Sequence, residues 1–301
     1  MDTKKLLFVY NPRAGKAKIR NKLCDIIDVF VKAGYEVTVY PTQYEGDAIS
    51  TVQNKTGDYD LLVCSGGDGT LDEVVNGMIK SARQIPIGYI PAGSTNDFAN
   101  SLRIPKDMVK AANVIAQGEE YACDIGTFNE ECFVYIAAFG LFTDVSYETS
   151  QEIKNVLGHM AYILEGMKRL SAIHSYPLKV RYKDEETGEE KVIEDEFIFG
   201  MVTNSLSVGG FKRITGKNVE LDDGKFEVTL IRKPLNVLDI NQISSALVNR
   251  KINIEYMYCF KTSELVFESE NEIPWTTDGE FGGNHTTVSI KNMKQAVKIR
   301  V

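Results

Sequence analysis

The chain has 301 residues, of which 43% are hydrophobic, and a formal net charge of −8 at pH 7. Its length allows two domains, each with a core of its own. The acidic balance argues against a nucleic-acid-binding protein, which would carry a basic face, and against attachment to membranes by overall charge. The longest apolar runs, such as 6–10 and 133–138, match core strands and are too short to cross a membrane. We therefore expect a cytoplasmic protein without a transmembrane segment.

The spacing of cysteine and histidine does not indicate a metal site. The five cysteines are scattered without a CxxC pair, and the three histidines stand alone. A zinc-binding set therefore cannot be assembled from the sequence. We expect the cysteines to be free thiols in a reducing compartment.

The first third of the chain alternates apolar runs with segments of helical period. Apolar residues repeat with helical spacing from Ile19 to Phe30 and from Leu71 to Ile79. Gly34 is expected to cap the end of the first of these helices. A weaker helical segment covers 47–54. Strands are expected between these helices, at 6–10, 35–40, 61–64 and 86–90. This alternation predicts a parallel sheet with helices on its faces, and ligands bind such sheets at the carboxyl ends of the strands.

From about residue 119 the pattern changes to a period of two, which is typical of half-buried strands. Thr187 and Gly188 predict a hairpin turn, and the acidic run around it is expected to be the solvated tip of that hairpin. We expect a second, mainly antiparallel β domain with a helical insertion at 151–172. Its strands are expected at 119–128, 132–138, 178–183, 192–201, 226–232, 252–260 and 263–268, with two more near the end.

A glycine-rich loop, Gly66-Gly67-Asp68-Gly69-Thr70, follows the third strand directly. Thr70 and Glu73 match a capping box, so the next helix is expected to begin at Thr70. Free N–H groups at such a helix start attract anions. The Walker A and dinucleotide-binding patterns are both absent. Asp68 would repel a phosphate unless a magnesium ion lay between them, and the alternative is a plain turn with a surface aspartate.

Five motifs in order carry a resemblance to a known family. They are NPRAGK at 11–16, GGDGT at 66–70, PAGSTNDFA at 91–99, LDDGKFEV at 221–228 and TTDGEFGG at 276–283. The set resembles the diacylglycerol kinase catalytic family, which includes soluble bacterial diacylglycerol kinases and the sphingosine and ceramide kinases. GGDGT alone also looks like NAD kinases and phosphofructokinases, whereas the ordered set spans nearly the whole chain.

The resemblance implies two domains. Residues 1–126 would form a nucleotide-binding, three-layer α/β domain with a parallel sheet, similar to NAD kinase and phosphofructokinase. Residues 127–301 would form a mainly antiparallel β-sandwich for the lipid substrate, which carries the base and metal motifs. The last strand could return to the first domain.

The resemblance also implies a nucleotide site. The first loop would contribute Asn11, Pro12, Arg13, Ala14 and Gly15. Arg13 and Ala14 replace the small hydroxyl residues common in this loop, so contacts there would run through backbone N–H groups or the arginine. Thr42 would reach the nucleotide from the second strand, and Ser94 would close the pocket. The phosphates would be held by Gly66, Gly67, Asp68, Gly69, Thr70, Leu71, Asp72 and Glu73.

The chemistry implied by the resemblance rests on carboxylates. Glu280 looks like the general base, whereas DGE alone is typical of a turn glutamate. Asp223 resembles the side-chain ligand of a magnesium ion, with backbone oxygens of Glu220 and Lys225 as companions. Without the other motifs, Asp223 would be read as part of a β-turn before the strand at 226–231. A water-linked acidic network with that metal would comprise Asp68, Asp97 and Asp124.

The resulting interpretation is an ATP- and Mg²⁺-dependent lipid kinase, peripheral to the membrane during catalysis. It would transfer the γ-phosphate to diacylglycerol or a related lipid alcohol. The alternatives are a NAD-kinase-like enzyme with a soluble acceptor and a non-catalytic nucleotide-binding regulator. Apolar residues at 139–142 and 156–167 would line an acyl groove or pack into a core. The sequence does not determine the acyl preference, the choice between ATP and GTP, or how the protein docks to a membrane. It also leaves the oligomeric state open, and a homodimer is one of the alternatives.

Overall fold

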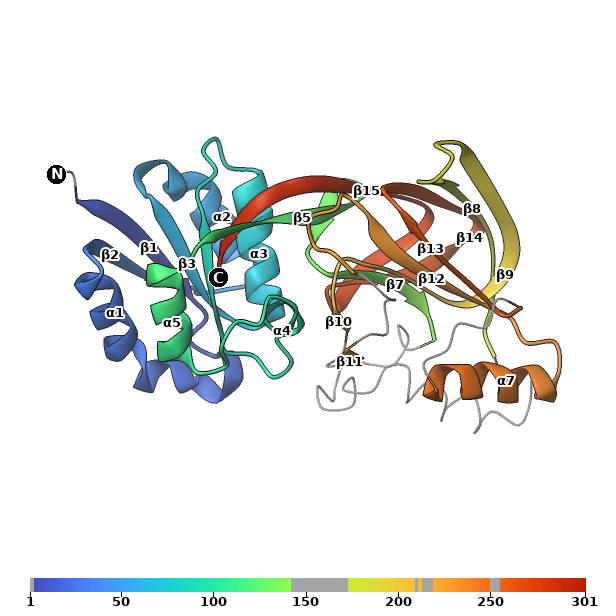
Figure 1. Cartoon of the computed structure of the whole chain (residues 1–301), viewed down its shortest axis with the longest axis horizontal. Coiled ribbons are helices and arrows are strands. Elements are labelled where there is room, and N and C mark those ends of the chain that lie inside the picture. The colour runs from blue at the N-terminus through green and yellow to red at the C-terminus, as the bar shows by residue number, and fades with distance from the viewer. Residues whose placement is uncertain (1–2, 142–172, 209–210, 213–218, 250–254) are drawn as a thin grey trace. The chain divides into compact units, whose positions relative to one another are not determined.

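The computed structural model describes residues 3–141, 173–208, 211–212, 219–249 and 255–301 (Figure 1). The helical insertion expected at 151–172 and the apolar segment 156–167 lie outside these residues. Contacts divide the chain into unit 1, residues 1–125 with 294–301, and unit 2, residues 126–293. Among the described helices, none has the length and apolar character needed to cross a membrane.

Unit 1 contains a parallel sheet whose strands follow the order β2-β1-β3-β4. These strands are β1 (Lys4–Tyr10), β2 (Tyr35–Pro41), β3 (Leu61–Gly66) and β4 (Ile87–Pro91). The end of β15 (Glu280–Arg300) adds a further parallel strand beside β4. The first three strands end together, because Tyr10 pairs with both Pro41 and Ser65. The expected strands of the first third are therefore present, in the expected parallel arrangement.

Helices cover both faces of this sheet. Residues 6–9 of β1 are fully buried, which requires neighbours on either side. In Figure 1, α1 and α5 lie on one side of the strands, and α2 and α3 pack together on the other. The helices of unit 1 are η1 (Ala14–Asn21), α1 (Leu23–Lys32), α2 (Asp47–Lys55), η2 (Thr56–Asp58), α3 (Asp68–Ile79), α4 (Asp97–Ser101) and α5 (Met108–Gln117). The single helix expected around Ile19 to Phe30 is divided into η1 and α1 at Lys22.

The expected capping box at Thr70 and Glu73 is wrong. Helix α3 begins at Asp68, its N-cap is Gly67, and no side chain caps it. The Glu73 carboxylate instead accepts the backbone N–H groups of Gly46, at 2.9 Å, and Ala48, at 3.1 Å. These donors belong to the start of α2, where the helix itself supplies no partners. Glu73 therefore fastens α2 to α3.

Unit 2 is mainly antiparallel, as expected. Its strand order is β13-β12-β9-β7-β14-β15, with β8 also between β9 and β14, and β5 beside β15 and β6. The expected strand at 132–138 is two strands, β6 and β7. Strand β5 (Glu120–Phe128) begins in unit 1 and ends in unit 2. The other strands are β6 (Glu131–Phe133), β7 (Ile136–Gly140), β8 (Tyr176–Lys183), β9 (Glu190–Thr203), β12 (Phe226–Arg232), β13 (Met257–Thr262) and β14 (Glu264–Thr277), with a short pair β10 (Ser207–Val208) and β11 (Phe211–Lys212).

These strands fold over one aromatic core. Phe133 of β6 stacks on Phe226 of β12, with ring centroids 5.5 Å apart, so strands distant in the sheet order face each other. Trp275 is 1% exposed and lies within 5.4 Å of Phe128 and 4.8 Å of Phe139, measured between ring centroids. The unit therefore packs like a sandwich, but its described strands, apart from the β10–β11 pair, form a continuous sheet rather than two separate ones.

Helix α7 (Val237–Val248) was not expected from the sequence. Asn236 caps it by accepting the N–H groups of Leu238 and Asp239, and Asp239 reaches back to the N–H of Asn236. This is a complete capping box built from Asn and Asp.

Candidate active site

Three loops meet at the carboxyl edge of the unit 1 sheet, and backbone hydrogen bonds join them. Asn11 N–H donates to the Ser65 carbonyl at 2.9 Å, and Ala92 N–H donates to the Gly66 carbonyl at 2.8 Å. Thr42 N–H donates to the Tyr10 carbonyl at 2.9 Å, which places the loop after β2 at the same edge. The sequence-predicted nucleotide loops are thus neighbours.

Two glycines allow these loops to approach more closely than side chains would permit. A Cβ on Gly15 would lie 1.7 Å from the Ala92 carbonyl oxygen, and its φ of +53° also disfavours other residues. A Cβ on Gly93 would lie 2.6 Å from the Gly67 Cα. The loop backbones are therefore in direct contact, as a site that binds its ligand through main-chain groups requires.

Helix α3 starts at this junction. The N–H groups of a first helical turn have no carbonyl partner within the helix, and the helix dipole attracts negative charge there. Thr70 faces the first loop, because its Oγ1 lies 3.5 Å from Asn11 Nδ2. The backbone N–H groups of Arg13 and Ala14 bond to Asn11 itself, at 2.9 and 3.3 Å, so the exposed arginine side chain is the group they leave for a ligand.

Not every residue of the expected phosphate loop can present its side chain. Leu71 is 1% exposed and belongs to the core. The Asp72 carboxylate accepts Asn76 Nδ2 at 3.1 Å within α3. Like Glu73, whose carboxylate holds the start of α2, these side chains serve the structure of the helix region, and the Leu71 N–H already bonds to the Gly67 carbonyl. Ser94 is exposed in the loop after β4.

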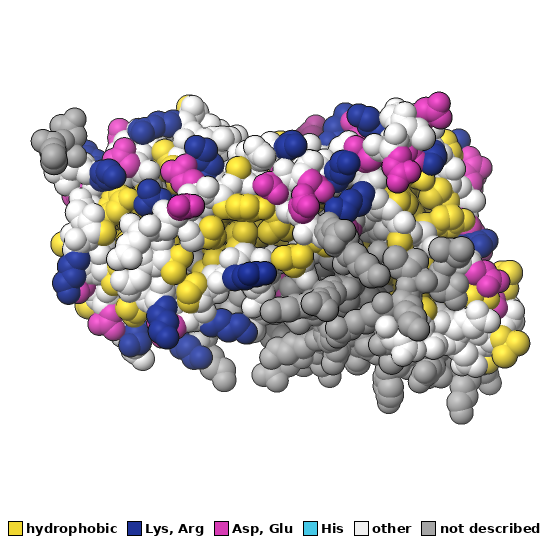
Figure 2. Space-filling model, viewed as in Figure 1, with side chains coloured by type: hydrophobic (Ala, Val, Ile, Leu, Met, Phe, Trp, Pro, Cys, Tyr) yellow, Lys and Arg dark blue, Asp and Glu magenta, His cyan; other side chains and the backbone are white. Residues whose placement is uncertain are grey.

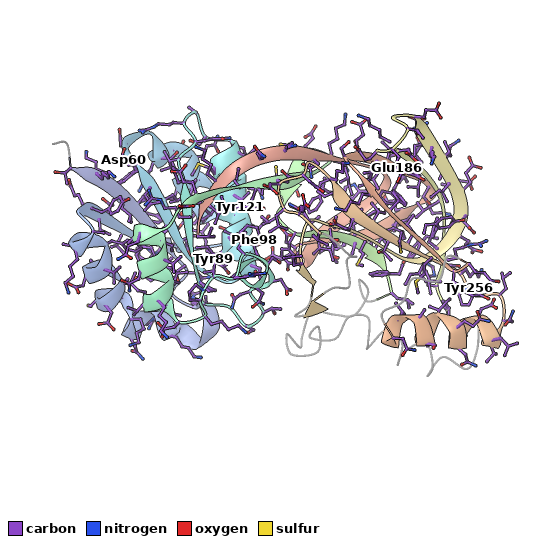
Figure 3. The ribbon with its side chains drawn as sticks, in the orientation of Figure 1. Asp60, Tyr89, Phe98, Tyr121, Glu186 and Tyr256 are labelled. Carbon is purple, nitrogen blue, oxygen red and sulfur yellow. The ribbon has the colours of Figure 1, made fainter. Side chains whose placement is uncertain are left out.

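Two of the expected acidic residues are neighbours in unit 1. Asp68 Oδ2 lies 3.4 Å from the backbone N–H of Asp97, which is 2% exposed at the start of α4. Tyr89 is labelled in Figure 3. Burial raises its pKa well above the usual value, and the charges of Asp68 and Asp97 raise the pKa further. The neutral Tyr89 hydroxyl can donate its one proton either to the Gly66 carbonyl or to Asn96 Oδ1, each at 3.2 Å.

Asp124, the third member of the expected network, is fully buried in β5. Its Oδ1 accepts the backbone N–H of Gln295 at 2.7 Å. Gln295 lies in the part of β15 that returns to unit 1. Asp124 therefore holds this returning strand in place.

Glu280 follows a tight hairpin turn in unit 2. Asp278 and Gly279 both have positive φ, +51° and +87°, as a two-residue type I′ turn requires. Thr277 and Glu280 form the pair that closes the hairpin, and the Glu280 side chain is exposed. The next residue, Phe281, is 60% exposed.

Asp278 anchors this turn, and the sequence analysis missed it. Its carboxylate accepts the N–H groups of Val134, Tyr135 and Ile136 at 2.6, 2.9 and 3.0 Å. The Tyr135 hydroxyl donates to the Asp278 carbonyl at 3.0 Å. Further along, His285 Nε2 lies 2.8 Å from the Gly282 carbonyl, so Nε2 carries the proton. The strand start that carries Glu280 is thus fixed on both sides.

Asp223 lies in a second charged cluster of unit 2. Its Oδ1 accepts the backbone N–H of Lys225 at 2.9 Å, and its Oδ2 lies 3.1 Å from Lys261 Nζ. The same ammonium lies 3.1 Å from Glu227 Oε1, which is directly across the β12–β13 ladder. Burial raises the pKa of Glu227 to about 7, although Lys261 opposes the shift.

The donor chemistry of the two acidic sites fits magnesium, although the described residues contain no ready cluster of three or more His, Cys, Asp or Glu. Asp223 with the carbonyls of Glu220 and Lys225 offers only oxygen, which hard cations prefer, and waters would complete the set. Lys261 supplies a competing charge there. In unit 1, Asp68 beside Asp97 is likewise an oxygen site.

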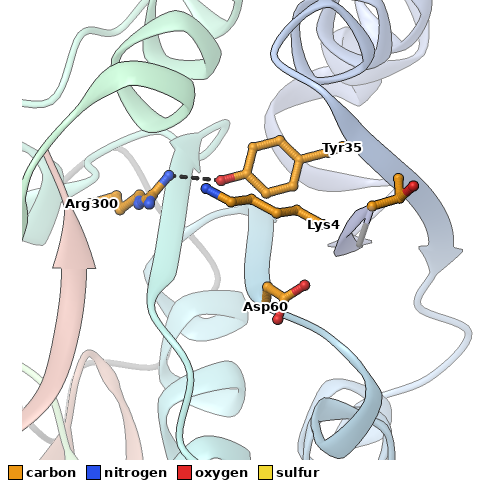
Figure 4. A pocket seen from close by; sticks show the side chains of 5 residues that line it. Lys4, Tyr35, Asp60 and Arg300 are labelled. Atoms are coloured by element: carbon orange, nitrogen blue, oxygen red, sulfur yellow. Dashed lines mark hydrogen bonds between the residues drawn. The ribbon is translucent and has the colours of Figure 1, made fainter. Parts of the chain in front are cut away.

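A hollow of about 350 Å³ lies at the opposite, amino edge of the unit 1 sheet (Figure 4). Lys4, Tyr35, Asp60 and Arg300 line it together with Thr3, and Arg300 Nη1 donates to the Tyr35 hydroxyl at 2.9 Å. None of the expected site residues lines it. On the face in Figure 2, acidic and basic side chains are interspersed among the described residues.

Comparisons with known proteins agree on one family. The diacylglycerol kinase catalytic domain matches residues 5–128. A diacylglycerol kinase of Staphylococcus carnosus is 33% identical over 98% of this chain and 94% of its own length. One of Bacillus subtilis is 32% identical over 93% and 91%. Two solved structures from Bacillus anthracis cover this whole chain and 96% and 97% of their own, with TM-scores of 0.82 and 0.76 and identities of 25% and 24%.

Proposed function

The chain belongs to the diacylglycerol kinase family, and we propose that it transfers the γ-phosphate of ATP to the hydroxyl of diacylglycerol or a related lipid alcohol. The product would be phosphatidic acid or an analogous lipid phosphate. Membership of the family makes the protein a lipid kinase. The nucleotide, the acceptor and the roles of individual residues are the proposal.

One observation carries the nucleotide part of the proposal. Three loops meet in backbone contact where α3 begins, and Asp68 lies next to Asp97 at that point. Phosphoryl transfer depends mainly on positioning and on charge neutralisation. The first-turn N–H groups of α3 bind the phosphates, and Gly67, Gly69 and Thr70 provide the surface against which they rest. Asn11 and Thr42 continue this surface toward the rest of the nucleotide.

Magnesium, when bound at the acidic residues, neutralises charge between carboxylate and phosphate. Asp68 and Asp97 supply oxygen ligands or hold water for it. At the second proposed site, the Asp223 carboxylate and the carbonyls of Glu220 and Lys225 play this part. Asp124 contributes by keeping the returning strand of unit 1 in register.

Glu280 acts as the general base in this proposal. An alcohol is barely ionised at neutral pH, so a carboxylate that accepts its proton contributes about 10²–10⁴ in rate. The exposed Glu280 carboxylate extends from a hairpin that Asp278 and His285 hold in place. The acceptor lies in a bilayer, so the protein would work at the membrane surface as a peripheral enzyme.

The test supplies radiolabelled ATP and detergent micelles that contain diacylglycerol, monoacylglycerol, ceramide or sphingosine. We expect label in the lipid extract with diacylglycerol or a close relative, and a loss of at least a hundredfold for Glu280→Gln. Glycerol and NAD serve as soluble acceptors in parallel. Label in the soluble acceptors alone would contradict the lipid acceptor, and unchanged turnover of Glu280→Gln would remove that residue from its role.

Nucleotide binding separates catalysis from a regulatory role. Glu280→Gln should bind ATP like the unchanged chain while it transfers no phosphate. An unchanged chain that binds ATP but labels no lipid alcohol at any magnesium concentration would contradict the proposed activity.

A further inference from the structure

Tyr44 is the most exposed aromatic side chain in the described part of the chain, at 68%. It lies in the loop at 42–46, between β2 and α2. A single exposed apolar side chain is common and needs no explanation by itself. The loop that carries this tyrosine, however, is hydrogen-bonded at both ends, and it lies at the carboxyl edge of the sheet.

Hydrogen bonds fix the loop at both ends. Thr42 N–H bonds to the Tyr10 carbonyl at 2.9 Å, and Gln43 N–H bonds to Asp47 Oδ2 at 2.8 Å. The Glu73 carboxylate of α3 holds the N–H groups of Gly46 and Ala48. The exposed tyrosine therefore lies in a loop that hydrogen bonds hold on both sides of it.

The same bonds connect the loop of Tyr44 to the helix that begins at the proposed phosphate site. Glu73 belongs to the second turn of the helix whose first turn would bind phosphate, and it contacts the loop directly. Strand β2 is the neighbour of β1, whose own loop contains Asn11. In open parallel α/β sheets, ligands bind along the carboxyl ends of the strands, and a ligand that starts at the loop after β3 can extend past β1 to the end of β2. Here that end is the loop at 42–46.

The chemistry of the loop favours a flat ligand. The N–H groups of Gln43, Gly46 and Ala48 already bond to carboxylates, so they offer little to a ligand. The exposed side chains of the loop are Gln43, Tyr44 and Glu45, and Tyr44 is the aromatic one among them. Aromatic rings stack on nucleobases, whose faces are all π-systems.

We propose that Tyr44 stacks on the purine base of the bound nucleoside triphosphate and sets the affinity for its base. This inference rests on the proposed function, because it assumes that the triphosphate occupies the start of α3. It assigns the base to unit 1, on the loop that Glu73 ties to the phosphate-binding helix.

Calorimetric titration of the full chain with ATP and with inorganic tripolyphosphate, both with magnesium, tests the proposal. We expect Tyr44→Ala to weaken ATP binding about fivefold or more and to leave tripolyphosphate binding unchanged. Tyr44→Phe should bind ATP like the unchanged chain, because stacking does not need the hydroxyl. Val31→Ala, which removes a 55% exposed side chain of α1, is the matched surface control and should change neither affinity.

Tyr44→Trp adds a readout that does not depend on affinity. The chain has one tryptophan, the buried Trp275, so a new indole at position 44 can be followed against a constant background. ATP should quench its fluorescence, and tripolyphosphate should not.

The outcomes separate this inference from the proposed function. Equal ATP affinity for Tyr44→Ala and the unchanged chain would overturn base stacking and leave the kinase intact. An equal loss for ATP and tripolyphosphate would also overturn it, because the loop would then support the phosphates. Failure of the unchanged chain to bind any nucleoside triphosphate would overturn the proposed function and this inference together.

Discussion

The two turns proposed to carry the chemistry are stabilised in opposite ways. At the start of α3, the loops meet because Gly15 and Gly93 lack a Cβ, so backbone lies directly on backbone. At the hairpin before Glu280, one carboxylate, Asp278, accepts three N–H groups of residues 134–136, between the end of β6 and the start of β7. The first arrangement leaves main-chain groups facing a ligand, and the second presents one side chain at a fixed place. The first turn is thus suited to binding through backbone N–H groups, and the second to holding a single carboxylate.

Substitution of Gly15 should have the largest effect. In Gly15→Ala the new Cβ would overlap the Ala92 carbonyl, and the positive φ adds strain, so the free energy of unfolding should fall by about 3 kcal/mol or more. Gly34→Ala is the matched control, because φ there is +89° with nothing within 4 Å, and it should lose only about 1 kcal/mol. Urea unfolding of both variants checks this. Equal losses would show that strain, and not loop contact, decides the effect.

Substitution of Asp278 tests the other turn. Asp278→Ala leaves three backbone N–H groups without their acceptor, which should reduce the free energy of unfolding by about 2–3 kcal/mol. Asp278→Asn keeps one carbonyl oxygen as an acceptor and should lose less. Lipid phosphorylation should fall in both while ATP affinity stays constant. A fall in ATP affinity would mean that this hairpin also supports the nucleotide.

Removal of the Lys261 ammonium should have a moderate effect. Lys261→Met leaves Asp223 and the buried Glu227 without their shared partner, at a cost of about 1–2 kcal/mol, because Glu227 can take up a proton. If the Asp223 carboxylate binds magnesium, removal of the competing charge should strengthen that binding. Added magnesium should then raise the melting temperature of Lys261→Met by more than it raises that of the unchanged chain. Identical responses to magnesium and to EDTA would argue against a metal at Asp223.

Glu280→Gln should have the smallest effect on stability and is the sharpest contrast with Asp278. The Glu280 side chain is exposed, so the melting temperature should not change. Circular dichroism melting beside the lipid kinase assay measures both quantities. A lower melting temperature would indicate that Glu280, like Asp278, supports the hairpin.

The regions predicted best are those whose partners are near in sequence or whose pattern is repeated. Buried strands such as β1 and β3 are continuous apolar runs, and the turns after them contain Gly and Pro. Helix α7 had a readable signal as well, the Asn236 and Asp239 box, but its Asn-x-x-Asp form differs from the Ser/Thr-x-x-Glu pattern used for α3.

Other features depend on partners far along the chain. Glu73 matched a local capping pattern, yet its carboxylate oxygens accept hydrogen bonds from the backbone N–H groups of residues 25 and 27 positions away. Asp278 was not singled out from the sequence at all, and its three bonds span 142 to 144 positions. Single-sequence patterns carry no information on such pairings, because they arise from how the sheet folds over its core.

The return of residues 294–301 to unit 1 has a consequence for biosynthesis. These residues pair with β4 and reach Glu119, yet the whole of unit 2 is translated before them. A nascent chain that has emerged only to residue 125 would expose the edge of β4, and exposed strand edges promote aggregation. We expect a fragment that stops there to be poorly soluble, and a separately added peptide of the last strand to rescue it.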